Sequence, residues 1–218
     1  MDGIHDMGGM HGLGPLEPTR EEPLSKSDWG LRTFCIESSY TQPGGFNVNW
    51  LRHMMECMTA TAYLTTTYYD RWYWRDAAVL ANGDWVSVEE LTTGKATSLP
   101  EDVGDPVPPE AVSMILEQGL ESRRPDEGDP RYGTGDRVRA TFHSPLGATR
   151  LPRYVRGHVG TVERYHGWHV LPDANAHGDA RAEPLYCIAF AAQDLWDDAG
   201  LGQGTVFADL WESYLEPA

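Results

Sequence analysis

The sequence predicts an α+β protein in which an extended N-terminal arm precedes a helical domain and a small antiparallel β domain. Glycines and prolines interrupt residues 1–25 so often that neither a long helix nor a central strand can form there. From residue 47, apolar side chains recur at spacings of three and four, as in an amphipathic helix. From residue 135 they alternate with polar ones, as in half-buried strands. We place the arm at residues 1–30, the helical domain at 31–130 and the β domain at 131–218.

The N-terminal arm has enough apolar side chains to bury against another surface. Ile4, Met7 and Met10 recur at every third residue, and Leu13 and Leu16 continue the pattern. Two interpretations stay open, a disordered tail and an extended segment laid along a second subunit. We predict the second, an arm that wraps a partner subunit.

The first helix is predicted from residue 48, after Asn47 as N-cap. One face of this helix carries the apolar residues Val48, Leu51, Met54, Met55 and Met58. Arg52 lies near the edge of that face, and Glu56 follows four residues later, which supports an ion pair on one helix. The spacing does not decide whether this pair belongs to a site or to the surface.

Three further helices are predicted before residue 123. The segment TTYYDRWYWRDAAVLAN is aromatic on all sides and ends near Gly83, so it is expected to be buried or to lie at an interface. Ser87 and Glu90 form the pattern of a capping box for a short helix. Pro109 suits the first turn of the last helix.

Short strands separated by glycine and proline are predicted from residue 135 to the end of the chain. DRVRATF alternates Val138, Ala140 and Phe142 with polar residues. YVRGHVGTVERY and LYCIAFAAQDLW continue the strands. The pattern GDRV…RGHVGTV resembles the start of an SH3-like barrel, so we expect an SH3-like antiparallel β-barrel or roll.

Charge is distributed unevenly along this acidic chain. The formal net charge is -16, yet residues 131–164 hold seven arginines and no lysine. Arg150, Arg153 and Arg156 recur at every third residue, and an extended backbone would place Arg153 on the opposite face from the other two. The acidic flanks argue against nucleic acid as a partner. Three interpretations remain for the run: solvated surface, a basic face, or guanidinium groups aimed at a localised anion.

Several classes of protein and site are excluded on composition. No apolar run approaches the ~20 residues of a transmembrane helix, and MDGIHDMGG does not have the pattern of a signal peptide. Three widely spaced cysteines argue against a disulfide framework and for the cytoplasm. No Cys/His box has metal-site spacing, so we expect no metal bound by this chain. The residues alone therefore indicate a two-domain subunit with an interface helix and no complete active site.

Several segments, in order along the chain, resemble the β subunits of nitrile hydratase. They are MDGIHDMGGMHGLGP, FNVNWLRHMMECM, YLTTTYYDRW, TRLPRYVRGHVGTV, FAAQDLW and DLWESYLEP. Agreement covers most of residues 1–80 and 135–218, while about 83–134 matches poorly. The resemblance implies an enzyme that hydrates nitriles to amides and is active only with an α subunit, as an αβ heterodimer or an α2β2 assembly. It also implies that a CxxCSC loop of the α subunit holds the metal, Co(III) by preference or Fe(III), with two of its cysteines oxidised.

The resemblance also assigns roles to residues of this chain. Arg52 and Arg150 would donate hydrogen bonds to the oxidised cysteine oxygens of the partner, with Glu56 and Tyr68 as further catalytic candidates. The substrate pocket would be lined by Val48, Leu51, Tyr69 and Trp72. Arg153 and Arg156 would bind the subunit interface or local carboxylates.

Three rival functions stay open on the sequence. A subunit of thiocyanate hydrolase would share the β domain and act on a small inorganic anion. An SH3-like binding module or a metallochaperone would lack catalysis altogether. A nucleic-acid binder would show salt-sensitive association with RNA.

Overall fold

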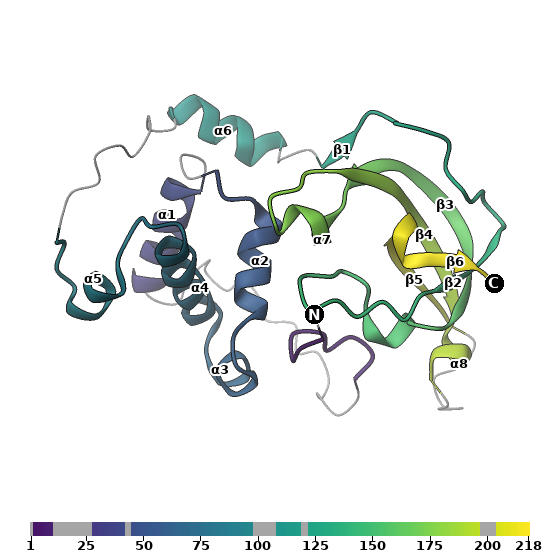
Figure 1. Ribbon diagram of the computed structural model, residues 1–218, viewed down its shortest axis with the longest axis horizontal. Helices are drawn as coiled ribbons and strands as arrows, with labels where there is room; N and C mark the ends of the chain where they lie inside the picture. Colours follow the sequence, from purple (N-terminus) through teal and green to yellow (C-terminus); the bar gives the residue numbers. More distant parts are fainter. Residues whose placement is uncertain (1, 11–27, 42–44, 98–107, 119–121, 197–203) are drawn as a thin grey trace. The chain divides into compact units, whose positions relative to one another are not determined.

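The computed structural model describes residues 2–10, 28–41, 45–97, 108–118, 122–196 and 204–218. The chain divides into two units (Figure 1). A sheet unit contains residues 1–10 and 121–218, and a helical unit contains residues 11–120. We describe each unit by itself. None of the described helices is long and apolar enough to cross a membrane.

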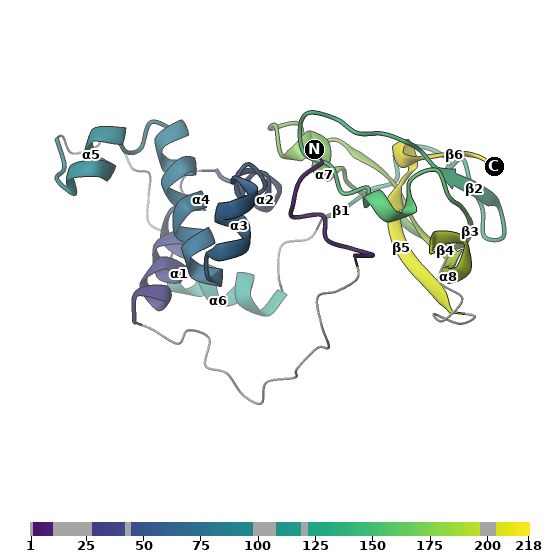
Figure 2. The same ribbon diagram turned by 90° about the horizontal axis from the view of Figure 1, so that it is seen from below.

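The helical unit contains six described helices. They are α1 (Asp28–Tyr40), α2 (Val48–Glu56), α3 (Ala60–Thr65), α4 (Tyr68–Asn82), α5 (Val88–Thr93) and α6 (Pro109–Gln118). Helices α1 and α2 both pack against α4 and flank it in both views (Figures 1 and 2). Their buried core consists of Tyr40, Phe46, Leu51 and Val79. Leu80, Trp50, Met54 and Trp85 pack against it and are partly buried.

Local capping residues define several helix ends, as predicted. The side chain of Asn47 accepts hydrogen bonds from the amides of Asn49 and Trp50 at the start of α2. Helix α4 ends at Asn82, before Gly83. Ser87 and Glu90 form the predicted capping box of α5.

Helix α1 was not predicted from the sequence, because it has no clear apolar stripe. The hydroxyl groups of its serine and threonine residues instead form hydrogen bonds within the helix. Thr33, Ser38 and Ser39 each donate to a backbone carbonyl three or four residues earlier. Such residues are typical of caps and turns, and their helical state here is set by packing against α4.

The sheet unit contains a six-stranded antiparallel sheet in the order β5-β4-β3-β2-β6, with β1 pairing to β3. The strands are β1 (Arg123–Arg124), β2 (Arg137–Ala140), β3 (Val159–Val170), β4 (Ala182–Ala191), β5 (Thr205–Trp211) and β6 (Leu215–Pro217). Figure 1 shows β3 and β4 as long strands that curve together through the unit. Short helical elements connect them: η1 (Arg153–Val155), α7 (Pro172–Asn175), α8 (Ala192–Leu195) and η2 (Glu212–Tyr214).

The core of the sheet unit is larger than that of the helical unit. It includes Tyr186, Ile188, Phe190, Leu210 and Tyr214, each at most 1% exposed. Across the described strands, β5 and β6 lie at the two ends of the order and are not paired with each other. The sheet is therefore open in the part of the chain described, and the expected closed barrel is not confirmed.

One strand of the sheet unit was not predicted, and two local expectations were wrong. The polar stretch after residue 122 contributes β1, because Arg123 and Arg124 pair with His169 and Trp168 of β3. The segment expected to continue as a strand through Ala192–Leu195 is the short helix α8. Phe142 does not continue the buried face of β2, because the strand ends at Ala140 and Phe142 is 77% exposed.

The described part of the arm, residues 2–10, belongs to the sheet unit of its own chain. We call residues 2–10 the N-terminal segment. It makes two tight turns, in which Asp6 N donates to Gly3 O and Met10 N donates to Met7 O. Met10 is half-exposed, and Leu13 and Leu16 lie outside the described residues. The wrapping of a partner subunit stays a prediction.

Candidate functional site

The arginine run of the sheet unit is not an extended strand. We call residues 149–156 the arginine loop. Pro152, with φ −64 and ψ 140, precedes the 3₁₀ turn η1 at Arg153–Val155. The alternation of faces that an extended backbone would give therefore does not apply at Arg153, because the turn replaces the period of two there. Each arginine of the loop has its own surroundings.

Arg150 is held at its backbone by a buried tyrosine. Its amide donates to the hydroxyl of Tyr214 at 3.1 Å. Tyr214 in turn donates to the carboxylate of Asp173 in α7. Burial, and then the adjacent Asp173 carboxylate, raise the pKa of Tyr214, so the hydroxyl stays protonated and can donate at neutral pH. Tertiary contacts from η2 and α7 thus fix the start of the arginine loop.

The side chain of Arg150 is half-buried and borders a small hollow. Its Nη1 donates to the carbonyl of Thr149 at 2.9 Å. The hollow has a volume of about 180 Å³. Its lining joins the N-terminal segment to the arginine loop and consists of His5, Asp6, Thr149, Arg150, Leu151 and Pro152.

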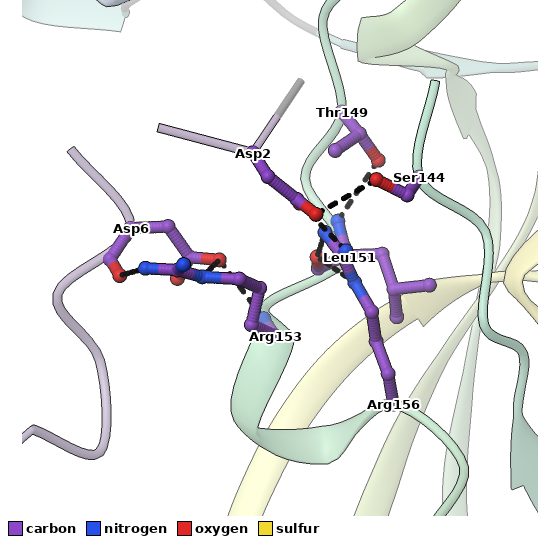
Figure 3. Close-up of polar contacts among 7 residues, drawn as sticks. All are labelled: Asp2, Asp6, Ser144, Thr149, Leu151, Arg153 and Arg156. Carbon is purple, nitrogen blue, oxygen red and sulfur yellow. Dashed lines mark hydrogen bonds and ion pairs between the residues drawn. The ribbon is translucent and has the colours of Figure 1, made fainter. Parts of the chain in front are cut away.

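The other two arginines of the run bind local carboxylates, which is one of the two roles expected for them. Arg156 Nη1 lies 2.6 Å from Asp2 Oδ1, and Arg153 Nε lies 3.4 Å from Asp6 Oδ2 (Figure 3). Both carboxylates belong to the N-terminal segment. The sequence did not reveal these pairs, because their partners lie 154 and 147 residues apart.

Arg52 lies on α2, in the helical unit, and is exposed. Its neighbour Leu51 is 5% exposed and belongs to the helical core, whereas Val48 is half-exposed. The structure pairs the Glu56 carboxylate with Nδ1 of His53 at 3.7 Å, and the ion pair predicted between Arg52 and Glu56 is not among the contacts of the described residues. On a helix, residues three apart are also neighbours, so spacing alone could not separate these alternatives.

Three of the predicted site residues contact one another at the start of α4, the catalytic candidate Tyr68 and the pocket candidates Tyr69 and Trp72. The ring centroids of Tyr68, Tyr69 and Trp72 lie 5.1–5.6 Å apart in all three pairs. Tyr68 is 59% exposed, while Tyr69 and Trp72 are half-buried. The cluster therefore presents a mixed aromatic and hydroxyl surface.

A buried ionic network supports this aromatic cluster from within the helical unit. Arg75 is 4% exposed, stacks over the ring of Trp72 at 4.6 Å, and donates to Asp76 from both Nε and Nη2. Glu37 and Tyr40 of α1 complete the network, at 3.1 Å from Arg75 and 2.8 Å from Asp76. Burial raises the pKa of both carboxyl groups, and Arg75 opposes that shift. Nothing in the sequence indicated that the adjacent residues Arg75 and Asp76 would be buried together.

A second polar cluster was also missed, on the strands of the sheet unit. His166, Cys187 and Asp209 offer ligand atoms within 4.8 Å of one another. His166 stands at a register shift of β3, and Cys187 and Asp209 are directly paired across β4 and β5. Burial and the Asp209 carboxylate raise the pKa of the Cys187 thiol. The Asp209 carboxylate is hydrogen-bonded to both His166 and Cys187, so the three side chains form one network.

The structure brings together some of the predicted site residues within each unit. Tyr68, Tyr69 and Trp72 form one group in the helical unit, and Arg52 and Val48 lie on α2 of the same unit. Arg150 belongs to the sheet unit, beside the N-terminal segment.

Comparison with known proteins covers nearly the whole chain. A family model described as "Nitrile hydratase beta subunit, N-terminal" matches residues 1–119, and "Nitrile hydratase beta subunit, C-terminal" matches residues 121–217. The low-molecular weight cobalt-containing nitrile hydratase subunit beta of Rhodococcus rhodochrous is 35% identical over the full length of both chains. Nitrile hydratase subunit beta of Pseudomonas putida is 34% identical, again over the full length of both.

Thiocyanate hydrolase subunit alpha of Thiobacillus thioparus is a more partial relative. It is 33% identical over 94 residues, which cover 42% of this chain and 75% of that protein. The nitrile hydratase matches, in contrast, extend through the N-terminal segment, the helical unit and the sheet unit. The chain belongs to the nitrile hydratase β-subunit family.

Proposed function

We propose that this chain works as the β subunit of a nitrile hydratase, which adds water to a nitrile to give an amide. The observation that carries the proposal is the match of both β-subunit family models, which together cover residues 1–119 and 121–217. The partner is an α subunit, in an αβ heterodimer or an α2β2 assembly. The SH3-like character of the sheet unit belongs to the same proposal, supported by its antiparallel order and tight glycine turns.

The metal of the enzyme belongs to the partner in this proposal, and the residues of this chain fit that division. Arginine has five N–H donors and no acceptor, so Arg52 and Arg150 suit anionic oxygens that surround a metal and cannot ligate the metal itself. When bound in the α subunit, the ion supplies Lewis-acid activation of the nitrile or of water. The name of the Rhodococcus rhodochrous relative includes cobalt, which supports cobalt over iron.

Arg52 and Arg150 would each donate charge-assisted hydrogen bonds to the oxidised cysteine oxygens of the partner. The exposed position of Arg52 on α2 and the half-buried position of Arg150 beside a hollow support this role. A negative oxygen buried at an interface is costly without a partner, and each such bond contributes about 1.5–3 kcal/mol. The rigid α2 backbone and the Tyr214 contact hold the two arginines in place.

The aromatic cluster of α4 would form part of the wall of the nitrile pocket. Tyr68, Tyr69 and Trp72 offer apolar faces to a hydrocarbon chain and hydroxyl groups that can orient the nitrile or water. Val48 would extend this wall, and Leu51 would support it from the helical core. Glu56 would act through His53, the side chain beside its carboxylate.

The proposal is tested by replacing each arginine with lysine in the assembled complex. Lysine keeps the charge but lacks the planar fork of donors. We expect Arg52→Lys and Arg150→Lys each to lower kcat by roughly ten- to hundred-fold, in line with the loss of one or two charge-assisted bonds. Arg137→Lys, an exposed arginine of β2, serves as the matched control and should keep full activity.

Size-exclusion chromatography of each variant would establish that the complex still assembles. Full activity in both Arg52→Lys and Arg150→Lys would contradict the proposed role. Activity of the parent complex on thiocyanate but not on aliphatic nitriles would instead favour the alternative function, a subunit of a thiocyanate hydrolase.

A further inference from the structure

The N-terminal segment binds the arginine loop through two separate carboxylates. Asp6 Oδ2 accepts from the amide of Arg153 at 2.9 Å, and the Asp6 carbonyl accepts from Arg153 Nη2 at 2.9 Å. Asp2 Oδ1 accepts from Arg156 Nη1 at 2.6 Å, and its Oδ2 accepts from Ser144 Oγ at 2.7 Å. Figure 3 shows both carboxylates facing the loop from the same segment. The segment therefore contacts backbone as well as side chains of the loop.

Arg156 binds both Asp2 and Leu151, which is the residue next to Arg150. Its Nε and Nη2 both donate to the carbonyl of Leu151, at 3.3 and 2.9 Å. One guanidinium thus joins Asp2 to the carbonyl of Leu151, the residue that directly follows Arg150. The Arg156 side chain is only 8% exposed, so loss of the Asp2 carboxylate would leave a buried guanidinium without this anionic partner.

Two glycines permit the close approach of the segment. A Cβ on Gly8 would lie 2.8 Å from the ring of Tyr154, and a Cβ on Gly9 would lie 2.9 Å from Tyr154 Cβ. Gly9 also has φ 72, which disfavours other residues. The ring of Tyr154 stacks on Trp196, whose Nε1 donates to the Gly9 carbonyl at 3.3 Å. The segment is thus fitted to the loop along its length as well as at its carboxylates.

We infer that Asp2 and Asp6 are positioning residues for catalysis, which hold the arginine loop, and with it Arg150, in the geometry that the partner's anionic oxygens require. Arg153 and Arg156 bind this segment and do not themselves contact the partner's anions. The inference rests on the proposed function for the role of Arg150. The anchoring of the loop by the segment can be measured independently of that role.

The test compares Asp2→Ala, Asp6→Ala and the double variant in the full complex. Hydrogen–deuterium exchange of the amides of residues 153–158 reports the anchoring directly, because the Arg153 amide donates to Asp6. We expect exchange there to be about ten-fold faster in the double variant. We also expect kcat to fall roughly ten-fold with little change in KM, because small misplacement of a catalytic group mainly affects the transition state. Asp209→Ala removes an exposed, paired carboxylate of the same unit and is the matched control.

A charge exchange distinguishes positioning from general damage. In Asp6→Arg with Arg153→Asp, the ion pair is re-formed with reversed sign, so we expect kcat and the exchange of residues 155–158 to recover relative to either single variant. The amide of residue 153 should keep its fast exchange, because arginine has no acceptor for it. Unchanged exchange of residues 153–158 in the double alanine variant would overturn the inference. Faster exchange with unchanged kcat would overturn the positioning role. If Arg150→Lys kept full activity, the proposed role of Arg150 would fail, and the exchange result would still decide whether the segment anchors the loop.

Discussion

The two units bury their charged groups in different ways. In the sheet unit, a large apolar core lies under the strands, and the arginines at its edge pair with carboxylates from the distant N-terminal segment. In the helical unit, the apolar core has four buried members, and an ionic network of Arg75, Asp76, Glu37 and Tyr40 lies beside it. Both units leave large aromatic rings exposed, Tyr68 and Tyr73 in the helical unit and Phe142 and Phe207 in the sheet unit. The difference indicates that apolar burial holds the sheet unit, whereas a buried ionic network contributes to the helical unit.

The largest expected effect tests the apolar core of the sheet unit. Phe190 is 1% exposed in β4, so Phe190→Ala should lower the free energy of unfolding by about 3–5 kcal/mol. Phe207 lies on the neighbouring strand β5 and is 57% exposed, so Phe207→Ala is the matched control and should change the free energy of unfolding little. Urea unfolding of the full chain, followed by tryptophan fluorescence, measures both. Equal losses of unfolding free energy in the two variants would contradict the conclusion that the apolar core holds the sheet unit together.

A smaller effect is expected from the ionic network of the helical unit. Asp76→Asn removes the anion that accepts from Arg75 and Tyr40, while Glu37 still pairs with Arg75. The free energy of unfolding should fall by about 1.5–3 kcal/mol, the range for hydrogen bonds to charged groups. Because Arg75 stacks on Trp72, the near-ultraviolet circular dichroism of the aromatic cluster should change as well. Glu89→Gln, an exposed carboxylate of α5, is the control, and an equal effect there would argue against the network.

The smallest effect concerns the cap of α5. The backbone and side-chain donors of Ser87 and Thr97 lower the pKa of Glu90 from 4.5 to about 2. A lowered pKa means that this contribution to stability is complete above the unfolded pKa and is lost as pH falls from about 4.5 towards 2. Glu90→Gln should therefore remove the pH dependence of α5 in that window. An NMR titration of the Glu90 carboxyl group checks this, and a midpoint near 4.5 would contradict it.

The elements that the sequence predicted well are those with local signals. Asn47, Gly83 and the pair Ser87 and Glu90 act within one helical turn of the ends that they define. Helix α1 had no such signal, since its serines and threonines favour turns as readily as helices. The 3₁₀ turn after Pro152 and the short strand β1 were missed for the same reason, because their state depends on contacts with other parts of the sheet unit.

Residue types and order along the chain were sufficient to identify the family and to select Arg52, Arg150 and the aromatic residues of α4 as candidates. Local capping and periodicity were sufficient for α2, α4, α5 and the buried face of β2, because these signals act between near neighbours. Only the tertiary structure decided which charges meet. Asp6 with Arg153, and Asp2 with Arg156, are joined across nearly the whole chain, and such pairs form only after the sheet has brought distant backbone together. The same physical reason explains why the arginine run is bound within its own chain at two of its three positions.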